Sequence, residues 1–111
     1  SDSERLARLR VPVVPTLQTI LIRESEQLSQ MSRWGEIAKI LSESNESGQL
    51  NSALKYQYAR ALSKTGNAQD QVKSLEVLKI LSESAPEEFW KNLAREALNN
   101  PNGNAKEGKI Q

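Results

Sequence analysis

Four cationic side chains and one tyrosine in the second half of the chain have the spacing of a binding surface. These candidate partner-binding residues are Tyr56, Arg60, Lys64, Lys91 and Arg95. Residues four positions apart lie on one face of a helix, so the pairs 60/64 and 91/95 each present two charges together. Arginine and lysine bind carboxylates through charge-assisted hydrogen bonds, which predicts an acidic protein or peptide as the partner. The alternative interpretation is an ordinary solvated face.

The residue types on which most enzymes depend are missing. The sequence contains neither histidine nor cysteine, which removes the usual general base, the commonest metal ligand and any thiolate. The carboxylate pairs Glu24 with Glu26 and Glu87 with Glu88 lie on predicted helices at spacings that do not converge. We therefore predict no catalytic residue, no metal site and no cofactor, and the chain is not expected to be an enzyme.

Length and charge indicate one domain without a general affinity for nucleic acid. The 111 residues suffice for a single core, and 15 basic against 14 acidic residues leave a net charge of +1. No apolar run approaches the roughly 20 residues of a membrane span, and the start lacks the apolar core of a signal peptide. The sequence predicts a soluble chain, with a cytoplasmic location favoured. A first residue that is Ser rather than Met is compatible with a trimmed fragment.

Apolar residues recur at helical spacing over most of the chain, so the predicted fold class is all-α. The five helices are expected near residues 16–31, 33–44, 50–65, 70–84 and 86–99. Ser32 and Asp70 are the predicted N-caps of the second and fourth helices. Gly66 is expected to end the third helix in a left-handed conformation, and Pro86 is expected in the first turn of the fifth.

The two ends of the chain are expected to lie outside the helical domain of residues 16–99. Residues 1–15 are predicted to form an extended lead-in segment, because Pro12 and Pro15 block an internal helix and also oppose a strand at residues 11–14. Residues 100–111 have little to bury and are predicted to be a disordered tail.

The chain also repeats itself. The first helices match at an offset of 34 residues, which pairs Ser25 with Ala59, and the closing helix continues at 35, which pairs Ala59 with Ala94. The second helices match at 40, because the hexapeptide KILSES occurs at residues 39–44 and again at 79–84. The six extra residues are assigned to the turn around TGNAQDQ. The sequence therefore predicts two helical hairpins plus one closing helix.

Side-chain size at the repeat positions predicts which residues are buried. Ser25, Ala59 and Ala94 are small residues at one repeat position, where two helices must approach closely, so all three are expected to be buried. Aromatic residues at helical spacing are expected in the core. Trp90 is predicted to point inward, which leaves Phe89 as the best candidate for an exposed aromatic side chain.

These spacings and motifs resemble the tetratricopeptide repeat. Residues 90–94, WKNLA, fit its opening pattern of Trp, Leu and a small residue, and residues 32–36, SRWGE, look like its turn into the second helix. Pro86 sits where the repeat-ending proline is expected, whereas Leu21 and Lys55 replace the opening tryptophan. The resemblance covers about residues 16–99 and implies hairpins stacked in a short right-handed superhelix.

The same resemblance implies a concave groove lined by one face of the first helices. Its three positions per repeat hold Ile22, Glu26 and Gln30, then Tyr56, Arg60 and Lys64, then Lys91, Arg95 and Asn99. The candidate partner-binding residues belong to the last two sets. Ile22 and Glu26 do not match the lysine and asparagine arrangement by which chaperone-binding relatives hold a terminal carboxylate.

A narrower resemblance concerns the second hairpin. Residues 58–78, YARALSKTGNAQDQVKSLEVL, look like the first, long-turned repeat of the mitochondrial and peroxisomal fission-adaptor family. That family continues into a complete second repeat and a C-terminal membrane anchor. Here one further helix follows, without such an anchor.

Two functions remain open from the sequence. The first is a non-catalytic protein–protein interaction module, which binds a peptide or a partner helix in the concave groove. The second is a structural subunit of a larger complex, either free or membrane-associated, which docks through its terminal segments or self-associates as a homo-oligomer. Two and a half repeats are few for a solenoid that must cover both of its ends, which favours some association.

Overall fold

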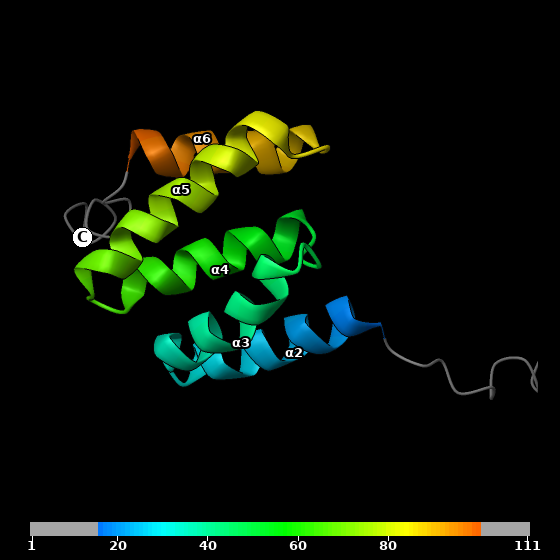
Figure 1. Ribbon diagram of the computed structural model, residues 1–111, viewed down its shortest axis with the longest axis vertical. Helices are drawn as coiled ribbons and strands as arrows, with labels where there is room; N and C mark the ends of the chain where they lie inside the picture. The colour runs from blue at the N-terminus through cyan, green and yellow to red at the C-terminus, as the bar shows by residue number, and fades with distance from the viewer. Residues whose placement is uncertain (1–15, 101–111) are drawn as a thin grey trace, which may run out of the picture.

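The computed structural model describes residues 16–100, and these residues form an all-α fold of five helices without a strand (Figure 1). The helices are α2 (Leu17–Gln30), α3 (Trp34–Glu46), α4 (Ser52–Lys64), α5 (Ala68–Ser84) and α6 (Glu88–Asn99). All five predicted helices are confirmed, with bounds that differ by at most two residues. The predicted lead-in at 1–15 and the tail beyond residue 100 lie outside the described residues.

The helices are stacked as two hairpins and a closing helix. Each helix packs against the next one along the chain, and α4 also contacts both α2 and α6. Figure 1 shows α4 in the middle, between the α2/α3 pair and the α5/α6 pair. The first helices of the hairpins and the closing helix therefore lie next to one another, as the repeat predicts.

One continuous core joins the five helices, and its largest fully buried apolar side chains are Ile37, Leu41, Leu54 and Leu81. The predicted small-residue contacts are confirmed, because Ser25, Ala59 and Ala94 are all buried. A side chain no larger than serine at these positions lets neighbouring helices approach closely.

Some large apolar side chains lie on the outer faces of the helices instead of in the core. Among residues 16–100, seven large apolar side chains are exposed, namely Leu17, Ile20, Met31, Val72, Leu75, Ile80 and Phe89. The predicted exposure of Phe89 is confirmed at 63% of its surface. On α6 only Ala94 is fully buried, whereas Trp90, Ala97 and Leu98 are partly buried against the core. Helix α4 lies in the middle of the stack and contacts every other described helix, so the remaining four helices have sides that no neighbour covers.

The turn between α2 and α3 shows that the predicted N-cap is wrong. Ser32 has a positive φ of 56°, and its N–H donates to the carbonyl of Ser29 at 3.0 Å. The N–H of Arg33 donates to the carbonyl of Leu28 at 2.9 Å. These two bonds form the motif that usually places glycine in the left-handed position. Ser32 therefore ends α2, and Arg33 is the N-cap of α3.

The turn between α4 and α5 also differs from the prediction. It comprises residues 65–67 and so has the same length as the turn at residues 31–33. Gly66 has the expected positive φ of 78°, but Asn67 rather than Asp70 is the N-cap, because its side chain accepts from the N–H groups of Gln69 and Asp70. The extra residues therefore lengthen α5 to 17 residues, against 13 in α3.

The starts of α4 and α6 are linked across the stack. Asn51 caps α4 by accepting from the N–H of Leu54 at 2.9 Å. The hydroxyl of Ser52 donates to the carboxylate of Glu87 at 2.7 Å, and Glu87 is the N-cap of α6. Pro86 precedes this cap, so its expected place in the first turn of the helix is wrong. The Ser52–Glu87 bond fixes the position of α6 against α4 near the pocket described next.

Candidate functional site

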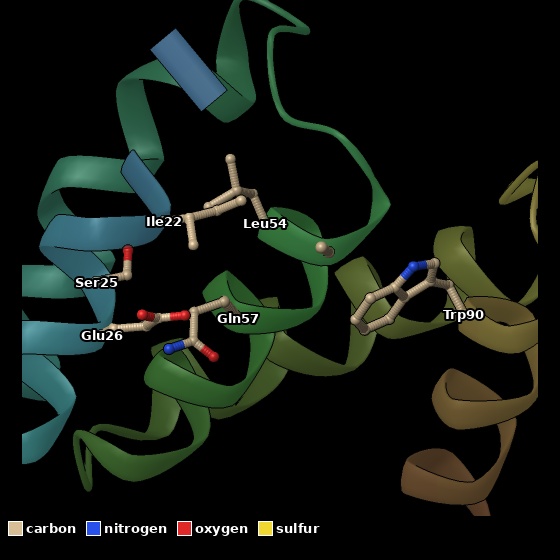
Figure 2. Close-up of a pocket in the computed structure, with 7 residues that line it drawn as sticks. Ile22, Ser25, Glu26, Leu54, Gln57 and Trp90 are labelled. Carbon is tan, nitrogen blue, oxygen red and sulfur yellow. The ribbon is translucent and has the colours of Figure 1, made fainter. Parts of the chain in front are cut away.

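A small pocket lies where α2, α4 and α6 meet, and we call it the three-helix pocket (Figure 2). Its volume is about 190 Å³. Its apolar lining comes from Ile22, Ala53, Leu54 and Trp90, and its polar lining from Ser25, Glu26 and Gln57. Sites for drug-sized ligands occupy roughly 300–1,000 Å³, so this pocket has room for one side chain rather than for a large cofactor.

Helix α2 supplies the charged wall of the pocket. Ile22, Ser25 and Glu26 face α4, because residues three and four positions apart share one side of a helix. Glu26 is exposed and is the only charged side chain in the lining. Within residues 16–100 no lysine or arginine lies within ion-pair distance of its carboxylate.

Ser25 has a hydroxyl group that is buried without a hydrogen-bond partner among residues 16–100. The residue is only 2% exposed. Buried polar groups are normally paired, and an unpaired one costs about 1–3 kcal/mol. This wall of the pocket therefore has unused hydrogen-bonding capacity.

The opposite side of the pocket is formed by α4 and α6. Figure 2 shows the indole ring of Trp90 extending from α6 toward α4, with Gln57 and Leu54 between it and α2. The Trp90 ring lies 5.7 Å from the Tyr56 ring, at an angle of 47°, and 5.0 Å from the Phe89 ring, in an edge-to-face arrangement at 87°. Aromatic contacts of this geometry are favourable and fix the orientation of the indole.

Two of the predicted cations are brought together at the C-terminal end of α4. The Arg60 guanidinium lies 5.4 Å from the centre of the Trp34 ring, and the Lys64 ammonium lies 5.2 Å from it. Both distances are within the range of cation–π attraction. We call Trp34, Arg60 and Lys64 the tryptophan–cation cluster.

The five candidate partner-binding residues do not form one contiguous contact set. Arg60 and Lys64 meet on Trp34, and Tyr56 packs against Trp90. Lys91 is half-buried and Arg95 is exposed on α6, and within residues 16–100 neither makes an ion pair or a cation–π contact. None of the five lines the three-helix pocket.

The groove positions of the first repeat were the better guide to the pocket. Ile22 and Glu26 were assigned to the groove from the repeat, and both line the pocket. Ala53, Gln57 and Trp90 were missed as lining residues, although Ala53 and Gln57 are one turn apart on the side of α4 that faces α2. The cation–π contacts of Trp34 were not predicted from the sequence. Its position at the start of α3 does not show that Arg60 and Lys64 of α4 lie beside its ring.

Two further kinds of site were sought in the described part of the chain. Residues 16–100 contain no group of three or more acidic side chains placed to hold a metal ion. Over the same residues, no helix has both the length and the apolar character needed to cross a membrane.

Comparison of the chain with family models, with curated proteins and with solved structures finds no match.

Proposed function

We propose that this protein is a non-catalytic protein–protein interaction module, which holds a peptide or a partner helix along the surface formed by α2, α4 and α6. The observation that carries the proposal is the three-helix pocket, since one cavity draws its lining from all three helices. A ligand seated there would touch every repeat of the stack, as in helical repeat proteins that bind along an extended surface.

The tryptophan–cation cluster supports an acidic partner. Arg60 and Lys64 carry two positive charges side by side, and no carboxylate among residues 16–100 lies within ion-pair distance of either. A carboxylate of the ligand can therefore bind there without first displacing an internal salt bridge. Lys91 and Arg95 add two positive charges on α6, apart from this cluster.

We also infer a tetratricopeptide-like architecture for this module. In support, the three small residues Ser25, Ala59 and Ala94 are buried at equivalent places, and each first helix contacts the next one in the stack.

The test is a selection of random displayed peptides against the immobilised 111-residue chain, followed by mapping of the bound peptides through backbone amide shifts. We expect the shifts on α2, α4 and α6, and we expect Arg60→Ala with Arg95→Ala to weaken an acidic peptide by roughly 1–3 kcal/mol. Lys39→Ala with Lys79→Ala is the matched control, because it removes two charges from α3 and α5. Contact confined to α3 and α5, or unchanged affinity in the first double variant, would contradict the proposal.

A second candidate is a structural subunit of a larger assembly. The observation that favours it is the exposure of Val72, Ile80 and Phe89, each by more than half of its surface. Light scattering after size-exclusion chromatography separates the two functions. A monomer over a wide concentration range supports the interaction module, whereas concentration-dependent association supports the subunit.

A further inference from the structure

We propose that the three-helix pocket is a receptor for the guanidinium group of an arginine side chain, carried by the bound segment of the partner. This inference rests on the proposed interaction function, because the arginine must come from a ligand on the α2, α4 and α6 surface. It names the side chain that the pocket accepts.

The charge of the pocket favours a cationic occupant. Glu26 contributes its only charged group, and its carboxylate extends toward α4 beside Gln57 (Figure 2). A neutral or acidic occupant would leave this carboxylate partly desolvated without compensation. A guanidinium group can pair with both carboxylate oxygens at once, which an ammonium group cannot do with the same geometry.

Trp90 provides a second feature suited to a planar cation. Tryptophan has the strongest cation–π attraction of the aromatic side chains, and arginine is the cation most often found over it. Tyr56 and Phe89 both contact the indole and restrict its orientation before a ligand arrives. The methylene groups of an arginine can lie on Ile22 and Leu54, which form the apolar wall.

Hydrogen-bonding capacity in the lining matches the remaining donors of a guanidinium group. The side-chain carbonyl of Gln57 can accept one bond. The unpaired Ser25 hydroxyl can accept another after a small separation of α2 from α4, since its oxygen is covered at present. Arginine has five N–H donors, and the pocket offers acceptors on both the α2 and the α4 side.

Two cations of α4 near the pocket are engaged elsewhere. Arg60 and Lys64 lie on α4 beyond Gln57, but both are held over the Trp34 ring. An arginine from a partner therefore does not compete with these two side chains for Glu26.

The test uses n-butylguanidinium as the probe and n-butylurea as its neutral isostere, added to the ¹⁵N-labelled 111-residue chain. We expect n-butylguanidinium to shift the indole N–H signal of Trp90 and the amide signals of Glu26 and Gln57 in a saturable manner. The urea should leave these signals in place. Glu26→Gln should weaken the binding of the guanidinium by about tenfold or more.

Glu24→Gln is the matched control, because it makes the same change of charge on the same helix at a residue outside the pocket lining. This variant should bind the probe as tightly as the parent does. Equal shifts with the urea, unchanged affinity in Glu26→Gln, or shifts at Trp34 instead of Trp90 would overturn the proposal. Failure of the interaction function has a different signature, in which n-butylguanidinium binds as expected but the displayed library yields no peptide. If the library yields peptides whose affinity is unaffected by Glu26→Gln, the interaction function is supported and the arginine receptor is contradicted.

Discussion

At the scale of single residues, the unpaired hydroxyl of Ser25 predicts that a smaller side chain is more stable there. Alanine occupies the equivalent positions 59 and 94, so Ser25→Ala should fit without a cavity. Because the variant removes an unsatisfied buried group and also gains helix propensity, we expect its free energy of unfolding to rise by about 1–2 kcal/mol. Urea denaturation measures this change.

Ser29→Ala is the control for Ser25→Ala. The Ser29 hydroxyl donates to the carbonyl of Glu26 at 2.8 Å, so its removal gives the same gain in propensity without relieving an unpaired group. Ser25→Ala should therefore stabilise the protein more than Ser29→Ala does. Destabilisation by Ser25→Ala would mean that the hydroxyl has a partner in solution, such as a bound water.

A second prediction at this scale concerns the residues with positive φ that end α2 and α3. Ser32 and Gly48 have φ values of 56° and 73° and occupy the same position in the two helix-ending motifs. A side chain in this conformation costs up to about 1–2 kcal/mol, whereas glycine adopts it freely. We expect Ser32→Gly to stabilise the protein by about 0.5–1 kcal/mol and Gly48→Ser to destabilise it by a similar amount in urea titrations. The same sign for both substitutions would argue against this account.

At the scale of the helices, the start of α5 depends on Asn67. Its side-chain oxygen accepts from the N–H of Gln69 at 2.8 Å and from that of Asp70 at 3.2 Å. Asn67→Ala should cost about 1 kcal/mol in the free energy of unfolding, as the loss of an N-cap usually does. Faster hydrogen exchange at the amides of Gln69 and Asp70 would locate the effect at this turn.

Asp70→Asn is the comparison for Asn67→Ala. The Asp70 side chain accepts from the Thr65 hydroxyl at 2.7 Å, and an asparagine oxygen can do the same. This variant should therefore cost less than Asn67→Ala. The reverse order would restore Asp70 as the residue that starts the helix.

The local sequence suffices to predict the five helices, but it predicts only some of the residues at which they begin and end. Periodic apolar residues and Gly66 suffice to predict α4 and its end. Asn67 and Asp70 are both good capping residues, so residue type alone does not show which of them is the N-cap. In the structure the Asp70 carboxylate accepts from the Thr65 hydroxyl, and Asn67 is the cap. Ser32 was misassigned because serine is far commoner at N-caps than in the left-handed conformation.

The pocket was harder to predict than the helices. Glu26 and Trp90 are far apart in the sequence and line one pocket because α2 and α6 both pack against α4. The repeat placed Ile22 and Glu26 in the groove, since those positions depend on one helix alone. The place of Trp90 depends on how α6 is turned against α4, and no local pattern specifies that rotation.

At the scale of the whole molecule, charge is balanced overall but concentrated where α4 ends. The chain has a net charge of +1, so long-range attraction is weak, and the tryptophan–cation cluster should dominate binding of an acidic peptide. Affinity should fall steadily as ionic strength rises from about 0.01 M to 1 M, over which the screening length shortens from about 30 Å to about 3 Å. Fluorescence anisotropy of a labelled acidic peptide measures this trend. Affinity that does not respond to salt would indicate an apolar interface.

The division of the three-helix pocket among α2, α4 and α6 has a consequence for how binding is linked to local unfolding. The outermost helices of a stack are the ones that detach most readily, and loss of either α2 or α6 would abolish the pocket. A ligand that binds only the fully docked form opposes fraying at both ends at once. Binding should therefore slow amide exchange in α2 and α6 together, although these two helices each pack mainly against other helices of the stack.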